Sequence, residues 1–262
     1  MREATYRAVI AAGRVALRAL DVTTRAEGAE HVPPSGPALL VSNHVSFPDF
    51  LFIGRALLGR RPFVRFMCRH DIWDVRLVGR AMTAMRHVPV DRTAPAAAYL
   101  TARRLLGEGE AVCVFPEAGI SAAYVVRALM PGAAALGRET GAPLVPVTIW
   151  GSQRIWAQKR DAAAVLPRPD LTRGRLVDVR FGEPQTVTPD ADVIAWTREH
   201  GHRMQRDLEA LQTLPEHRPR PGELAPWHPA HLGGQALDRT ASFALDRSPH
   251  SAVAPVWGPL DE

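Results

Sequence analysis

Between residues 38 and 184 the sequence alternates short apolar runs with longer stretches of helical periodicity. Short apolar runs rich in valine, isoleucine and leucine are typical of strands that are buried on both faces. Repeated strand–helix–strand units predict an α/β fold with a mostly parallel, covered sheet and flanking helices. The pattern predicts strands at 38–43, 62–69, 86–90, 111–117, 143–150 and 175–184, and helices at 49–60, 71–85, 94–109, 131–141 and 190–212.

The two ends of the chain differ from this pattern, so we divide the sequence into three parts. Residues 1–24 form an N-terminal amphipathic segment, with a helix expected at 2–20. That helix either packs on the domain or lies in a membrane interface with its arginines on lipid phosphates. Residues 25–213 form the main domain. Residues 214–262 are rich in proline, glycine and histidine, which predicts an extended or disordered tail.

The basic charge of the chain is carried almost entirely by arginine, since Lys159 is its only lysine. The formal net charge is +5, and arginine favours phosphate groups and anionic membrane faces because a guanidinium binds phosphate oxygens in pairs. Nucleic acid is not expected as a partner, because no recognition-helix, zinc-finger or ribonucleoprotein pattern occurs. The N-terminus lacks a signal-peptide pattern and no apolar segment is long enough to span a bilayer. We therefore expect a cytoplasmic protein, associated peripherally with the inner face of the cell membrane.

Several kinds of chemistry lack their sequence signals. The chain has no G-x-S-x-G elbow, no Walker loop and no G-x-G-x-x-G fingerprint, which argues against serine hydrolases and nucleotide-dependent enzymes. Cys68 and Cys113 lie in apolar runs, which favours buried free thiols over a disulfide or redox pair. The histidines after residue 214 have neither cysteine partners nor metal-ligand spacing, so no metal is expected.

The stretch NHVSFPD at 43–49 places a polar cluster directly after an apolar strand. Pro48 suits the first turn of a helix, and Asp49 would then lie near the positive end of the helix dipole. His44 can fold back onto Asp49 through the short loop between them. A carboxylate bonded to one imidazole nitrogen fixes the tautomer and raises the basicity of the other nitrogen, which can then accept a proton from a hydroxyl. The alternative is a capped strand-to-helix turn beside a solvated histidine.

Three more blocks follow in order, HVPVDR at 87–92, FPEAGIS at 115–121 and LVPVTIWG at 144–151. Together with NHVSFPD, which fits the pattern N-H-x-S-x-x-D, they resemble the 1-acyl-sn-glycerol-3-phosphate acyltransferase family, also called the glycerolipid acyltransferases. The resemblance covers roughly residues 27–185 and implies a glycerolipid acyltransferase-like fold. It also implies acyl transfer from a thioester donor, acyl-CoA or acyl carrier protein, to a lipid hydroxyl. That donor is a co-substrate, and no cofactor is implied.

The resemblance implies roles for individual residues. His44 would be the general base and Asp49 its orienting partner, while Arg92 would bind the phosphate of the acceptor. Glu117 and Arg92 also have simpler interpretations, as a helix cap and a surface arginine. The other positions carried over as substrate-binding are Asn43, Ser46, Phe115, Pro116, Glu117, Ser121, Val145 and Pro146.

The third block departs from the family pattern F-P-E-G-T-R-S. Ala118, Gly119 and Ile120 stand in place of glycine, threonine and arginine. In the family that arginine helps to hold the phosphate of the acceptor, which Ile120 cannot do. Arg127 is a candidate substitute and is counted among the substrate-binding residues. Met130 stands where many relatives carry a lysine.

The sequence therefore predicts an O-acyltransferase that acylates a lysophospholipid such as 1-acyl-sn-glycerol 3-phosphate, giving phosphatidic acid. One alternative is a member of the same family that acts on a different lipid alcohol. The others are a non-catalytic lipid-binding member and a thioesterase-like hydrolase with water as the acceptor. The partners expected are a lipid acceptor, an acyl thioester donor and a membrane surface, with acyl carrier protein as one candidate carrier of the donor.

Overall fold

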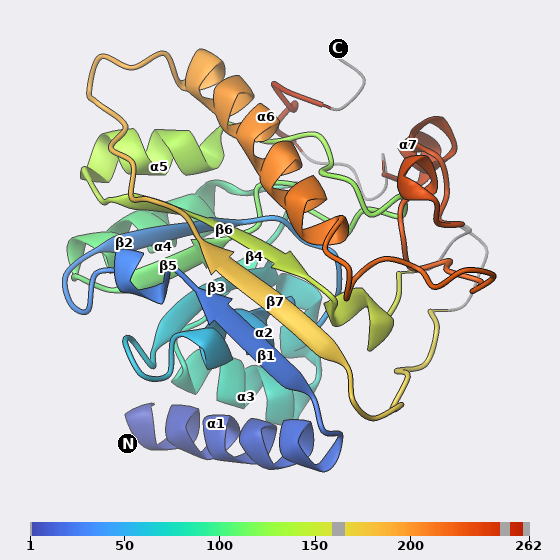
Figure 1. The fold of residues 1–262 in the computed structure, drawn as a ribbon. Coiled ribbons are helices and arrows are strands. Elements are labelled where there is room, and N and C mark those ends of the chain that lie inside the picture. The colour runs from blue at the N-terminus through green and yellow to red at the C-terminus, as the bar shows by residue number, and fades with distance from the viewer. Residues whose placement is uncertain (1, 159–165, 247–251, 259–262) are drawn as a thin grey trace.

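A seven-stranded sheet lies at the centre of the computed structural model, which describes residues 2–158, 166–246 and 252–258 (Figure 1). The strand order is β1-β7-β6-β2-β5-β3-β4, and every pair is parallel except β6 with β7. This confirms the predicted mostly parallel α/β fold. The strands are β1 Thr23–Glu27, β2 Ala38–Ser42, β3 Val64–Arg69, β4 Val88–Val90, β5 Ala111–Val114, β6 Leu144–Trp150 and β7 Leu176–Phe181.

Helices cover both faces of the sheet. As the chain steps outward from β2 to β4, α2 and α3 lie on one face of the sheet, and as it returns, α4 and α5 lie on the other (Figure 1). This is the arrangement expected of right-handed crossovers. α1 packs on α3, and α6 packs beside α5 over β6 (Figure 1). The helices are α1 Arg2–Ala19, α2 Asp49–Ala56, α3 Arg76–Ala84, α4 Ala96–Gly107, α5 Gly132–Thr140, α6 Val193–Gln212 and α7 Arg239–Asp246. The 3-10 turns are η1 Ala29–His31, η2 His70–Asp74, η3 Ser152–Arg154 and η4 Ala230–Leu232.

The parallel direction of β2, β3, β4 and β5 brings their carboxyl ends to one edge of the sheet. His44 follows β2, Arg69 ends β3, Arg92 follows β4 and Phe115 follows β5. Polar and aromatic side chains that are far apart in the sequence are therefore collected at that edge, where open α/β sheets place their ligands.

The N-terminal helix packs its apolar side inward. Tyr6 and Leu17 are buried, and the Tyr6 hydroxyl donates a hydrogen bond of 2.7 Å to the carbonyl of Val64 in β3. The ring of Tyr6 also meets Phe63 edge-on at 5.2 Å. Of the two interpretations of the helix, packing on the domain is the one that accounts for its apolar face. In the described parts of the chain, no helix is both long enough and apolar enough to cross a membrane.

Strand β1 was not expected from the sequence. Its residues are mostly exposed and polar, so the strand gives no apolar signal. It pairs in parallel with β7 at the edge of the sheet, with Arg25 opposite Asp178. The boundary predicted between residues 24 and 25 falls inside this strand.

The described residues of the C-terminal segment, 214–246 and 252–258, do not form the extended or disordered tail predicted for 214–262. Over these residues the segment folds back on the domain, with η4 and α7 among its turns (Figure 1). His217 and Trp257 are buried, and the N–H of Leu129 donates a hydrogen bond of 2.8 Å to the carbonyl of Trp257. The Trp257 ring lies so close to Gly201 of α6 that a Cβ there would come within 2.4 Å of it. The segment has a low apolar content, and it is held on the domain by a few buried aromatic and histidine side chains.

The carboxylate of Asp178 ties this segment to the sheet. It is nearly buried and accepts two hydrogen bonds of 2.6 Å from the guanidinium of Arg25, and Nε2 of His217 lies 2.6 Å away. Burial raises the pKa of Asp178, but the hydrogen bonds from Arg25 and His217 outweigh that effect and hold the pKa at about 2.

Because this folded-state pKa lies below the unfolded value, ionised Asp178 stabilises the fold above about pH 4. That contribution, about 2 kcal/mol, should disappear as the pH falls from about 4 to 2. Urea unfolding should therefore show the wild-type chain losing more stability over this range than Asp178→Asn, which has no carboxylate to protonate. Equal losses in the two proteins would contradict the assignment.

Candidate active site

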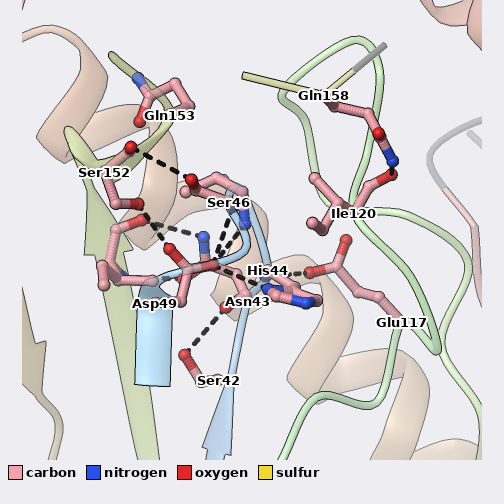
Figure 2. Close-up of polar contacts among 12 residues, drawn as sticks. Ser42, Asn43, His44, Ser46, Asp49, Glu117, Ile120, Ser152, Gln153 and Gln158 are labelled. Carbon is pink, nitrogen blue, oxygen red and sulfur yellow. Dashed lines mark hydrogen bonds and ion pairs between the residues drawn. The ribbon is translucent and has the colours of Figure 1, made fainter. Parts of the chain in front are cut away.

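A fully buried carboxylate, that of Asp49 at the start of α2, organises the end of β2 (Figure 2). Its Oδ2 atom accepts hydrogen bonds from Nδ1 of His44 at 2.8 Å and from the N–H groups of Val45 and Ser46 at 2.9 Å each. Its Oδ1 atom accepts a hydrogen bond from the hydroxyl of Ser152. The positive end of the α2 dipole adds to these interactions. The structure thus brings together the two residues predicted to be catalytic.

The imidazole of His44 is held on two sides. Nδ1 bonds to Asp49, and the ring stacks on Phe115 with centroids 4.2 Å apart and planes inclined by 24°. Because the carboxylate is an acceptor, the proton of the neutral ring resides on Nδ1 and leaves Nε2 as the basic atom. The side chain is 19% exposed, and it lines the large cavity at this edge of the sheet. His44 is therefore suited to accept a proton from a group bound there.

Glu117 is a second buried carboxylate, and it joins two loops. Oε1 accepts a hydrogen bond of 2.6 Å from the N–H of His44, and Oε2 accepts one of 2.6 Å from the N–H of Arg127. Glu117 was carried over as substrate-binding, but it is 1% exposed and does not line the cavity. Its contacts position the backbone of His44 and Arg127.

The cavity beside His44 has a volume of about 1440 Å³. This exceeds the roughly 300–1,000 Å³ that is usual for small-molecule sites. Of the residues predicted to bind substrate, Arg92, Phe115, Pro116 and Arg127 line it. Most of the remaining wall is apolar, including Phe47, Phe50, Met67, Ile72, Val78, Met82, Tyr99, Leu100, Leu136, Trp156, Leu245 and Val253. Such a cavity combines a large apolar space with a few cations.

Three arginines approach one another in the cavity wall, namely Arg69, Arg92 and Arg127. Burial, reinforced by the charges of Arg69 and Arg127, lowers the pKa of Arg92 from its ordinary value. Arg127 extends across Gly119, where an added Cβ would lie 1.9 Å from its Nη1 atom. A site with positive charge gathered in a partly desolvated wall is suited to an anionic group.

The other predicted substrate-binding residues lie outside this cavity wall. Asn43 exchanges two hydrogen bonds with the backbone of Ile149, of 3.0 and 2.8 Å, and Ser46 donates to the carbonyls of Ser152 and Trp156. Both residues fasten the end of β2 to β6 and the turn that follows. Ser121 is buried, and Val145 and Pro146 lie inside β6.

Ser152 is the residue of the cluster that the sequence analysis missed. It comes directly after Gly151, at the end of β6 and therefore beyond the fourth block. Gly151 has a φ of 107°, and a Cβ there would lie 2.2 Å from the carbonyl oxygen of Leu176, so only glycine fits this turn. A polar residue after a strand end was the available signal. For Leu245 and Val253, which reach the cavity from the C-terminal segment, the sequence carried none.

Both cysteines are free thiols, as predicted. Burial raises the pKa of Cys68 to about 12, and burial also raises that of Cys113 well above its ordinary value. Cys68 lines the cavity, but a thiol held in this protonated form is a poor nucleophile. Neither cysteine is therefore suited to form an acyl-enzyme.

Residues 23–150 match the family model described as Acyltransferase. This part of the chain belongs to the acyltransferase family. The match spans β1 to β6 and contains His44, Asp49, Arg92 and Glu117, and it confirms the resemblance seen in the sequence blocks.

Individual relatives agree with the family match. A 1-acyl-sn-glycerol-3-phosphate acyltransferase from Arabidopsis thaliana chloroplasts is 33% identical over 133 residues, which are 49% of this chain and 36% of that protein. An uncharacterized protein of Mycobacterium tuberculosis is 29% identical over 175 residues, which are 62% of this chain and 44% of its own length. The chain thus matches less than half the length of these curated relatives.

A solved structure shares the fold. The 1-acyl-sn-glycerophosphate acyltransferase PlsC from Thermotoga maritima superposes with a TM-score of 0.64, at 20% sequence identity. The match covers 81% of this chain and 82% of that one. At this identity the likeness establishes the architecture, a mostly parallel sheet with flanking helices.

The hydroxyl of Ser152 should be needed to stabilise the buried Asp49 carboxylate. We expect Ser152→Ala to lower the free energy of unfolding by about 1–3 kcal/mol, because a buried charged acceptor loses one donor. Ser121→Ala is the matched control. Ser121 is as fully buried as Ser152, but its hydroxyl has no hydrogen-bond partner within the described structure. Urea unfolding of both variants checks this, and an equal loss of stability would contradict the role of Ser152.

Proposed function

We propose that the chain transfers a fatty acyl group from a thioester donor, acyl-CoA or acyl carrier protein, to the hydroxyl of a lysophospholipid. 1-Acyl-sn-glycerol 3-phosphate is the acceptor that fits best, and phosphatidic acid is then the product. The observation that carries the proposal is the His44–Asp49 pair at a large apolar cavity whose wall also contains Arg92 and Arg127. The family match of residues 23–150 supports the same reaction class.

The mechanism follows from the geometry of the pair. Nε2 of His44 accepts the proton of the acceptor hydroxyl as its oxygen attacks the thioester carbonyl. Asp49 holds the ring and stabilises the imidazolium that forms. When the tetrahedral intermediate collapses, the C–S bond breaks and His44 returns the proton to the departing thiolate. No acyl-enzyme and no cofactor are needed, and the donor enters as a co-substrate.

Different parts of the proposed site suit different parts of the substrates. The apolar wall suits acyl chains, because burial of each methylene removes apolar surface from water. The guanidinium groups of Arg92 and Arg127 suit the phosphate of the acceptor. Since a lysophospholipid resides in a bilayer, the reaction takes place at a membrane surface. We place the protein peripherally on the cytoplasmic face, where acyl-CoA and acyl carrier protein are found.

Mass spectrometry of the products tests the reaction class. Isotope-labelled acyl-CoA is offered with a mixture of lysophospholipids and neutral lipid alcohols. Labelled phosphatidic acid is the expected product. Labelled ester on another lipid alcohol would indicate a different acceptor, and free fatty acid formed equally with or without acceptor would indicate a hydrolase. Binding of substrates without any turnover would indicate a non-catalytic member.

His44→Ala should lower kcat by on the order of 10²–10⁴-fold, because the general base is lost. His31→Ala is the control, since His31 is also partly buried, with a side-chain exposure of 27%, but bonds to the carbonyl of Phe181 away from the cavity. Initial rates with acyl-CoA and thermal unfolding of each variant give the comparison. Turnover near the wild-type rate in a folded His44→Ala protein would exclude this role.

Arg92→Gln and Arg127→Gln should each raise KM for 1-acyl-sn-glycerol 3-phosphate by on the order of 10- to 100-fold, because a charge-assisted hydrogen bond is lost. A neutral lipid alcohol should show a much smaller change. Gly119→Thr should act in the same direction, because its Cβ would displace the guanidinium of Arg127. Arg103→Gln is the control, because Arg103 is half exposed on α4 and pairs with Glu139. Equal effects on charged and neutral acceptors would contradict phosphate binding.

A further inference from the structure

The first turn of α3 and the residue before it leave large apolar side chains in solvent. Val75 is 59% exposed, Leu77 is 79% exposed and Val78 is 43% exposed. Arg76 and Arg80 are exposed beside them, as is one acid, Asp74. Single exposed apolar residues are ordinary, but three within four consecutive positions form a patch that marks an interaction surface. We name Val75, Arg76, Leu77, Val78 and Arg80 the α3 face.

The neighbouring helix α1 cannot supply such a patch. Its apolar side chains Tyr6 and Leu17 are buried against the domain. The outward side of α1 carries mainly alanines and arginines, and Val15 is its one large apolar residue that is highly exposed. A bilayer that approaches this side of the molecule therefore meets its strongest apolar contact on α3.

The α3 face is continuous with the wall of the large cavity. Val78 belongs to both, since it is exposed to solvent and lines the cavity. Ile72 of η2 and Met82 of α3 line the cavity next to it, and so does Arg69, which precedes η2. Ile72, Val78 and Met82 therefore give the cavity an apolar wall on the side of the α3 face.

The positive charge of the α3 face favours an anionic surface as its partner. Arg76 and Arg80 lie beside apolar groups, an arrangement typical of proteins that insert apolar side chains below anionic headgroups. Trp73 lies with them in the wall of a shallow hollow between η2 and α3, and tryptophan is enriched at membrane–water interfaces. Asp74 offsets part of the charge, but the two arginines leave the patch basic.

We propose that the α3 face docks the protein on an anionic lipid bilayer and opens the cavity toward it. The inference rests on the proposed function in one respect, namely that a lipid substrate has to enter the cavity. Leu77, Val75 and Val78 enter the headgroup region, while Arg76 and Arg80 bind lipid phosphates. Docking is reversible, because the contact is a single short apolar patch with two cations.

The test is co-sedimentation of the full chain with vesicles of phosphatidylcholine that contain increasing amounts of phosphatidylglycerol. Leu77→Asp should weaken binding by about tenfold or more, because an inserted apolar side chain becomes an anion. Leu224→Asp is the matched control, since Leu224 is 78% exposed and Leu77 is 79% exposed, but Leu224 lies in the C-terminal segment. Arg76→Ser with Arg80→Ser should remove most of the dependence on phosphatidylglycerol and on salt.

Two further measurements separate the possible outcomes. Leu77→Asp should keep its melting temperature and its activity on a short-chain, water-soluble donor and acceptor, because Leu77 does not line the cavity. If the wild-type protein binds vesicles but forms no product from the short-chain donor and acceptor, the proposed function is refuted and the docking proposal stands. Unchanged vesicle binding by Leu77→Asp, or an equal loss in Leu224→Asp, would overturn the docking proposal. So would a concentration-dependent dimer that Leu77→Asp disrupts without changing vesicle binding, since the patch would then bind a second copy.

Discussion

A charged carboxylate that is wholly removed from water remains stable only where donors replace its lost hydration. Asp49 meets this condition with donors from separate parts of the chain. The N–H groups of Val45 and Ser46 come from the loop after β2, the ring of His44 from the end of that strand, and the hydroxyl of Ser152 from the turn after β6. One anion therefore fixes the strand end, the loop and the start of α2. The orientation of the imidazole follows from that constraint.

Glu117 extends the same principle to the loop after β5. Its two oxygens accept hydrogen bonds from the N–H groups of His44 and Arg127, so the backbones of these two cavity-lining residues are joined through one buried side chain. Asn43 adds two bonds to Ile149 on the far side of β2. Because these groups are already paired in the folded chain, little reorganisation is needed when substrate binds. The imidazole of His44 is thus held at the cavity wall by its bond to Asp49 and by its stacking on Phe115.

What the sequence predicted, and what it did not, follows from how local each interaction is. The central strands were predicted because every residue of β2 and β6 is buried, whereas the polar edge strand β1 gave no apolar signal. The His44–Asp49 contact was predicted because a short loop joins the two residues. Ser152 was missed, because its contact with Asp49 spans 103 positions. Val145 and Pro146 were carried over as pocket residues, but they lie inside a strand that is covered on both faces. The burial of Trp257 depends on its contact with Gly201 of α6, and the composition of the C-terminal segment does not indicate that contact.

The geometry of the loop after β5 explains how the third block can depart from the family pattern. Ala118 has a φ of 52°, in the left-handed region that suits the glycine of the family pattern, so the loop keeps its path although a Cβ costs it about 1 kcal/mol. At the next position, glycine in place of threonine leaves the space that the guanidinium of Arg127 occupies, since a Cβ would lie 1.9 Å from Nη1. Ile120 carries no charge, and the arginine that lies beside this block is Arg127, in the space that Gly119 leaves. A cation still reaches the cavity wall, but it comes from a residue farther along the chain, and its position depends on Gly119 remaining a glycine.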